Sequence, residues 1–288
     1  MRGIFPDMDK ARMKNRVSAY DYFLRLCEMC LACFKWNNLP DTCDERTIEL
    51  SLLSTGKVLF FKDDTLSYLS LPFNSVGGFN CYGLPLERQA YSNYNSYTAT
   101  RGTTDSVIIY NNKLRTNMTV NIIMYANRLY ELDRTIDVNV NAQKTPILLI
   151  GDQKQQLALR NLYDKYAGNA PVIYADNQIN KTEIKSIATT APFVSPELYR
   201  LKVNIWNEVL TYMGVANITT DKKERMISDE VERGMGGVFI NRNIRLKERQ
   251  IACDKINKMF DLDISVEFDE EMTDKIKDDI EKEVYADE

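Results

Sequence analysis

The 288-residue chain contains no histidine, and this absence removes several kinds of chemistry at once. Histidine is the most common general base and metal ligand, and it is the side chain that changes charge near neutral pH. Ser-His-Asp and Cys-His nucleophilic catalysis within one chain are therefore excluded. We expect no signal peptide, because the N-terminal stretch has no apolar core followed by a small-residue cleavage site, and no apolar run approaches the roughly 20 residues that cross a bilayer. We expect synthesis in a reducing, intracellular compartment and no membrane partner.

Three of the six cysteines stand close together, in the stretch CEMCLAC that contains Cys27, Cys30 and Cys33. This spacing imitates a zinc or iron–sulfur site. No glycine or proline bends the surrounding run around a metal, and the run predicts a helix from Asp9 to Trp36. On such a helix the thiols share one broad face with apolar neighbours, as small core residues do. The sequence therefore predicts no metal and no cofactor here.

The stretch from Thr145 to Tyr166 has the strand–glycine–helix order of many nucleotide sites. A single glycine, Gly151, stands where a dinucleotide motif needs three, and no Lys-Ser/Thr pair follows as in a P-loop. An N-cap role explains Asp152 without a ligand. We predict a structural strand and helix, and no bound nucleotide.

The remaining patterns predict a mainly α chain with α+β parts. Two long helices, 117–141 and 196–214, flank a small α/β module, so the helices should pack side by side as a stalk. The region 72–104 is rich in Asn, Gly, Ser and Tyr and predicts a long loop with at most short strands. Shorter elements are expected as helices at 45–53, 154–166 and 243–260, and as strands at 57–63, 66–71, 106–112, 146–150, 168–175, 182–188 and 263–268.

Charge is unevenly distributed although the net charge is only −4. From Asp261 onward there are 13 acidic residues and three lysines, so the rest of the chain is mildly basic. Between Asn217 and Arg233, four cations face five acidic residues. This balance suits either a solvated loop or a surface that meets a phosphate backbone without adhering to it, since tight binding needs uncompensated cations. The candidate residues are Lys222, Lys223, Glu224, Arg225, Asp229, Glu230 and Arg233, with Gly234, Gly236 and Gly237 as a flexible hinge.

A collinear series of stretches makes the chain recognisable as a whole. The series comprises WNNLP at 36–40, FFKDDTLSY at 60–68, VIIYNN at 107–112, NAQKTPILL at 141–149, QLALRNLYDKYAGNAPVIYA at 156–175, APFV at 191–194, WNEVLTYMG at 206–214, DKKERMISDEV at 221–231 and ACDKINKMFDLDISVEF at 252–268. In this order the chain resembles the portal protein, also called the upper collar or head–tail connector, of small short-tailed phages with protein-primed linear genomes.

That resemblance implies a portal fold whose subunits form a ring, dodecameric in this family, around a channel for double-stranded DNA. It divides the chain into a wing (1–116), stem helices (117–142 and 196–214), a clip (143–195), a channel loop (215–238) and a crown with an acidic tail (239–288). It also implies a virion protein without catalytic activity, assembled in the host cytoplasm. Its partners would be further copies of itself, the major capsid protein, a separate packaging ATPase and the lower collar or tail proteins.

Two other readings stay open from the residues. One is a nucleic-acid-binding phage replication protein that forms no ring. The other is an enzyme that uses the carboxylates between Asp261 and Glu271. Molecular mass in solution separates them, because only the portal reading requires a ring of many copies.

Overall fold

The protein is described by a computed structural model that covers residues 7–143, 147–150, 172–175, 192–216 and 228–270. Within this part it is an α+β chain whose strands form small sheets. Its helices are α1 (Asp7–Leu31), α2 (Glu45–Thr55), α3 (Thr119–Ala142), α5 (Ser195–Met213) and α6 (Ser228–Phe260). Its strands are β1 (Phe34–Asn37), β2 (Lys57–Asp63), β3 (Ser67–Leu71), β4 (Phe73–Phe79), β5 (Pro85–Tyr91), β6 (Thr98–Arg101), β7 (Ser106–Tyr110), β8 (Ile147–Ile150), β9 (Val172–Ala175) and β10 (Ser265–Phe268).

The chain divides into two compact units, which share α3 and α5. Unit 1 comprises Met1–Arg128 and Ile205–Glu288, and unit 2 comprises Leu129–Asn204. No helix in the described part of the chain is long and apolar enough to cross a membrane.

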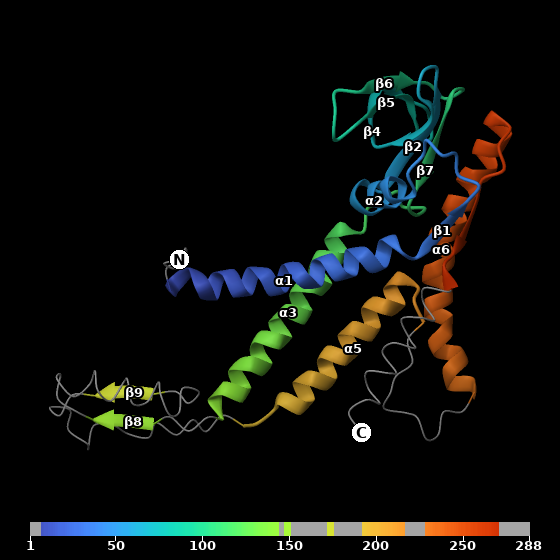
Figure 1. The fold of residues 1–288 in the computed structure, drawn as a ribbon. Helices are drawn as coiled ribbons and strands as arrows, with labels where there is room; N and C mark the ends of the chain where they lie inside the picture. Colours follow the sequence, from blue (N-terminus) through green and yellow to red (C-terminus); the bar gives the residue numbers. More distant parts are fainter. Residues whose placement is uncertain (1–6, 144–146, 151–171, 176–191, 217–227, 271–288) are drawn as a thin grey trace. The chain divides into compact units, whose positions relative to one another are not determined.

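The core of unit 1 is built on strand β2, whose residues 58–61 are all fully buried. β2 is the central strand of the antiparallel sheet β3-β2-β7, which explains why its sequence is a continuous apolar run and does not alternate. Leu59 and Phe61 pack with Phe73 and neighbours in the second sheet, β4-β5-β6. Phe60 packs in another direction, with its ring 5.6 Å from that of Phe260 at the end of α6. Figure 1 shows α2 and the two sheets gathered in this part of unit 1.

Helix α2 is bounded by the residues that the sequence favours at helix ends. The Asp44 carboxylate accepts a hydrogen bond from the Thr47 N–H at 3.0 Å, which caps the first turn. The helix ends at Gly56, whose φ of 78° is left-handed and whose N–H donates to Leu52 O. A Cβ at this position would lie 2.6 Å from the carbonyl carbon of Thr116, so Gly56 also permits close packing before α3.

In both units α3 and α5 lie side by side, as predicted for the two long helices (Figure 1). In unit 1, the Tyr125 hydroxyl donates to Glu208 Oε1 at 3.0 Å. In unit 2, Lys202 pairs with Asp133 at 2.7 Å, and Asn139 accepts bonds from the Val194 N–H and the Ser195 hydroxyl. Unit 2 also contains a parallel pair of strands, β8 and β9, in which Ile147 is opposite Val172.

Several predicted boundaries are wrong. The region 72–104 holds a three-stranded antiparallel sheet, β4-β5-β6, where a loop was expected. Residues 34–37 form strand β1 paired with β10, so the first helix ends at Leu31 and does not reach Trp36. The helix α5 begins at Ser195, one residue earlier than expected, because Val194 O accepts the first helical bond from the Leu198 N–H. The predicted helix at 154–166 and strand at 182–188 lie outside the described residues.

Candidate functional site

The predicted channel-loop residues fall into two groups. Lys222, Lys223, Glu224 and Arg225 lie outside the described residues. The others lie in α6, which begins at Ser228; they are Asp229, Glu230, Arg233, Gly234, Gly236 and Gly237. The predicted irregular loop is therefore wrong for 228–238, and the three glycines stand inside a helix, not at a loop hinge.

Tertiary packing explains why the helix continues through glycines, which cost about 1 kcal/mol each relative to alanine in a helix. Val238 is buried, and the Asn241 side chain donates to Thr211 O of α5 at 3.1 Å. Thr211 also lies 3.5 Å from the position that a Cβ on Gly237 would take. Residues 237–241 of α6 are thus packed closely against the end of α5.

Helix α5 ends in a tight cap that directs the chain into the 217–227 segment. Gly214 has a φ of 77°, and the Gly214 and Val215 N–H groups donate to Thr211 O and Leu210 O. This is the Schellman pattern, which requires a left-handed residue after the last helical one. A Cβ on Gly214 would lie 2.8 Å from the backbone of Arg242, so only glycine fits.

Three arginines of α6, which we call the arginine ladder, lie beside this cap, and the first two of them bind it. Arg242, Arg245 and Arg249 follow the i, i+3, i+7 spacing that places side chains on one helix face. Arg242 Nε donates to Gly214 O at 3.2 Å, and Arg245 donates to the carbonyl oxygens of Tyr212 and Met213. Cations at a helix C-terminus satisfy its free carbonyls and oppose its dipole. The ladder therefore fixes the end of α5 on α6.

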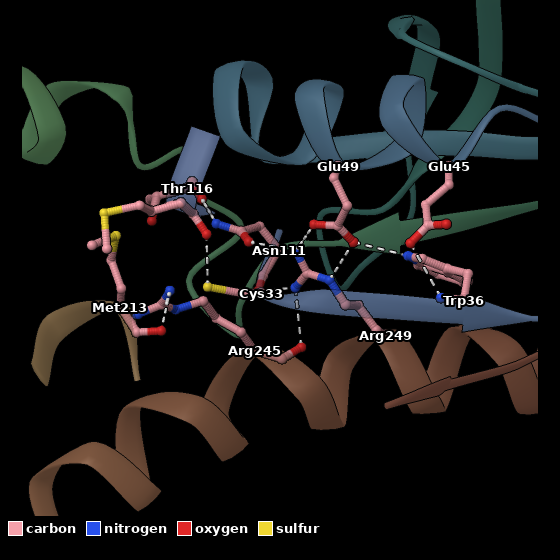
Figure 2. A network of polar contacts seen from close by, with 10 residues as sticks. Cys33, Trp36, Glu45, Glu49, Asn111, Thr116, Met213, Arg245 and Arg249 are labelled. Atoms are coloured by element: carbon pink, nitrogen blue, oxygen red, sulfur yellow. Dashed lines mark hydrogen bonds and ion pairs between the residues drawn. The ribbon is translucent and has the colours of Figure 1, made fainter. Parts of the chain in front are cut away.

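The third arginine joins this cap to the core of unit 1. Arg249 is 2% exposed and forms a bidentate ion pair with Glu49 of α2 (Figure 2). Its Nε donates to Glu49 Oε1 at 2.9 Å and its Nη2 donates to Glu49 Oε2 at 2.6 Å. Glu49 also accepts a bond from Trp36 Nε1 at 3.0 Å, and Asn111 accepts from the guanidinium through its side chain and its carbonyl oxygen. The Phe34 ring lies 4.0 Å from the guanidinium carbon. Elements α2, β1, α6 and the turn after β7 thus meet at one buried charge pair.

The cysteines near the ladder behave as core residues, as predicted from the sequence. Cys30 and Cys33 are buried, and their thiols donate to Met213 Sδ and to Met29 O. Burial raises the pKa of Cys30 strongly and that of Cys33 to about 11, so both thiols stay protonated at neutral pH. Burial also lowers the pKa of Arg245.

The alternative hypothesis of an enzyme depends on the carboxylates between Asp261 and Glu271. In the described part of the chain these carboxylates do not converge on one site. Glu270 pairs with Arg242 at 3.2 Å, and Glu267 accepts a bond from the Asn37 side chain. Asp263 is exposed and its carbonyl oxygen accepts from Asn38. Among the described residues no group of three or more acidic or cysteine side chains is placed to hold a metal ion.

The arginine ladder was not predicted from the sequence. A signal was available, since Arg245, Arg249, Ala252 and Ile256 recur at helical spacing and share the buried face of α6. Sequence alone does not reveal Glu49 as the partner, because it lies 200 residues away.

Paired helices and small sheets are fixed to each other by buried polar contacts, and the polar groups of the ladder are occupied by structural bonds. The family model described as "Phage Connector (GP10)" matches residues 6–273, and the chain therefore belongs to the phage connector family. It is a component of the connector, or portal, of a phage virion.

One solved structure is similar over nearly the whole length of both chains. It is described as "Portal and tail of native bacteriophage P68", and the alignment covers 98% of this chain and 99% of that one. The sequences are 20% identical and the TM-score is 0.49.

Proposed function

We propose that copies of this chain form a ring at one capsid vertex, through which double-stranded DNA is packaged and later ejected. The match to the phage connector family over residues 6–273 is the observation that carries this proposal. In this ring, which we take to be dodecameric, the clip at 143–195 meets the packaging ATPase and then the tail. The wing (1–116) and crown (239–288) lie around the stem helices and contact the capsid side.

A closed ring needs two different surfaces on each subunit, because each copy contacts its two neighbours differently. Unit 1 exposes two apolar patches that meet this need. The α3 patch consists of Val120, Ile123 and Met124, and the α6 patch consists of Phe239, Ile240 and Ile244; Val120 and Phe239 are 69% and 65% exposed. Contiguous apolar surface of this kind marks interaction sites in soluble proteins.

The α6 patch also surrounds a hollow of about 280 Å³, lined by the three apolar residues with Lys113, Asn243, Lys247 and Glu248. Its apolar floor and charged rim resemble the usual arrangement of protein interfaces. We infer that the α3 patch of one copy packs into the α6 hollow of the next.

The paired helices α3 and α5 suit a channel wall that DNA passes without sticking. Together they carry four cationic and five acidic side chains. Two of the cations form ion pairs between the two helices, Arg128 of α3 with Glu208 of α5 and Lys202 of α5 with Asp133 of α3. Because affinity for DNA rises steeply with the number of neutralised phosphates, a nearly balanced wall keeps adhesion low.

The same balance supports a role for the segment between α5 and α6 as the part that reaches into the channel. In this proposal Lys222, Lys223 and Arg225 touch phosphates transiently, while Glu224 prevents capture. Asp229, Glu230 and Arg233 add to this balance from the first turns of α6.

Ring formation is tested by native mass spectrometry and negative-stain microscopy of the purified chain. Rings are expected, and Val120→Glu or Phe239→Lys should abolish them, because either change buries an unpaired charge at the subunit contact. Tyr94→Lys is the matched control, since Tyr94 is 83% exposed and belongs to neither patch. A single copy at every concentration tested would overturn the ring and favour a replication protein.

The role of charge balance needs a packaging assay. Neutralising Glu224, Asp229 and Glu230 together removes three negative charges per copy and leaves the cations uncompensated, so DNA should adhere and packaging should slow. The double swap Lys222→Glu/Glu224→Lys keeps the net charge and should package at the normal rate. Equal rates for the neutralised variant and the unmodified protein would refute a low-adhesion wall.

A further inference from the structure

Unit 1 contains a second surface feature that the connector role does not explain. A pocket of about 430 Å³ lies between strands β5 and β7 and the end of helix α6. Its apolar lining is formed by Leu84, Val107, Ile108, Tyr110 and Met259, and its polar lining by Arg88, Lys255, Lys258, Thr103 and Ser106. Three cations thus surround an apolar floor, and none of the lining residues is acidic.

Arg88 is a buried cation of this pocket without an acidic partner in the described part of the chain. Its side chain is only 7% exposed. Its Nη1 donates to the carbonyl oxygen and hydroxyl of Ser106, at 2.8 Å and 3.0 Å. Its Nε has no hydrogen-bond partner in the described part of the chain, and no ion pair there neutralises it. A buried guanidinium without a carboxylate is unfavourable, so the pocket is suited to bind a negatively charged group.

Neighbouring charges do not meet this need. Asp105 is close enough to act on Arg88 through space, but its Oδ1 accepts from the Gly102 N–H at 2.6 Å. Lys255 and Lys258 extend from exposed positions of α6, and neither forms an ion pair within the described residues. Burial lowers the pKa of Arg88, as expected for a cation that lacks a counter-charge.

We propose that this pocket binds the acidic C-terminal segment, residues 271–288, of the same chain. That segment carries eight acidic residues and three lysines. Asp279, Ile280 and Glu281 place one apolar side chain between two carboxylates, which matches an apolar floor between cations. A nucleic-acid phosphate would bring charge without an apolar group, so the floor favours the peptide.

The chain is long enough to reach the pocket within one copy. The Phe268 ring lies 3.8 Å from the Arg242 guanidinium carbon, and Glu270 pairs with the same arginine, so residue 270 stands beside Arg242. Lys258 follows Arg242 by 16 residues on α6, a rise of about 24 Å. Ile280 follows Glu270 by ten residues, and ten extended residues span up to about 33 Å. The segment therefore covers the distance back along α6.

Photo-crosslinking of the full-length protein tests this placement. A benzophenone amino acid at position 280 should crosslink to Met259 or Leu84, as located by mass spectrometry of the digested protein. The charge-reversed variant Lys255→Glu/Lys258→Glu should lower the crosslink yield roughly fivefold, the effect expected for two partly exposed ion pairs. The reversed segment Asp279→Lys/Glu281→Lys should restore the yield when combined with it.

The controls separate the alternatives. Benzophenone at Tyr94, which lies outside the pocket, should give no crosslink to Met259. Crosslinks from position 280 to other surfaces, or a yield unchanged by the lysine reversal, would overturn the proposal. A product of twice the chain mass on a denaturing gel would assign the segment to a neighbouring copy and overturn binding within one chain. Loss of crosslinking on adding a short DNA duplex, with DNA bound through Lys255 and Lys258, would assign the pocket to nucleic acid instead.

Discussion

Replacing Arg249 by methionine removes the cation at the centre of unit 1 and leaves the Glu49 carboxylate buried without its partner. Glu49 is 3% exposed and Arg249 is 2% exposed, so the carboxylate has little access to solvent in the folded protein. Breaking a buried ion pair on one side costs about 3–5 kcal/mol, because the remaining charge is uncompensated. We expect Arg249→Met and Glu49→Gln each to lower the free energy of unfolding by an amount in this range.

Urea unfolding followed by tryptophan fluorescence measures this change. The chain has two tryptophans, and Trp36 Nε1 donates to Glu49, so a Trp206→Phe background makes Trp36 a local reporter. With a slope of roughly 3 kcal/mol per molar urea, the midpoint should fall by about 1–2 M. All variants are compared at one protein concentration, since assembly adds to apparent stability.

The double variant Glu49→Leu/Arg249→Met separates the pair energy from simple loss of packing. It removes both charges, so its cost should be smaller than the sum of the single costs by at least about 2 kcal/mol. Arg25→Met is the control, because Arg25 pairs with Asp21 at an exposed site and should cost less than about 1 kcal/mol. Additive costs, or a cost for Arg249→Met no larger than for Arg25→Met, would refute the argument.

Two further predictions concern the cap of α5 and its pairing with α3. Gly214→Ala should cost about 1–3 kcal/mol of unfolding free energy, since φ is 77° and the new Cβ meets the Arg242 backbone. Gly83→Ala, with a similar φ but open space around it, should cost less; equal costs would contradict the close approach. Burial and the bond to Glu208 raise the pKa of Tyr125 to about 12, so stability should fall between pH 10 and 12 as the unfolded tyrosine ionises first. Tyr125→Phe should flatten this decline by about 1 kcal/mol after solvent screening, whereas Tyr20→Phe at an exposed position should not.

The elements that local chemistry determines were predictable from the sequence. Helix α2 was expected at 45–53 and is observed at Glu45–Thr55, between its Asp44 cap and Gly56. The two long helices α3 and α5 lie within two residues of their predicted bounds. In these cases the apolar periodicity and the capping residues predict the same helix, and tertiary contacts do not change it.

The elements that depend on distant partners were not predictable. Strand β1 continues a helical pattern locally, and its partner β10 lies about 230 residues further along. Strand β4 has few buried residues, so its sequence lacks the alternation of a half-buried strand and reads as a loop. The first turns of α6 contain three glycines and were predicted as loop, yet packing on Thr211 favours helix.

In the candidate site, too, the features set by local sequence were predicted and those set by distant partners were not. Local charge pointed to the balanced segment after α5, and the arginines that fix the end of α5 were missed. Arg245 and Arg249 were not predicted as site residues, because no local feature of the sequence identifies Tyr212, Met213 or Glu49 as their partners. Burial of arginine is decided by the acceptors that the fold brings to it.

Helix α6 is fixed to its neighbours at one section near its middle. Its 33 residues form a rod of about 50 Å, held on α5 and α2 by the arginines between positions 242 and 249. Beyond this section, α6 also packs against β7 and β10. We therefore expect a displacement of its first turns to be passed along the helix to these two strands.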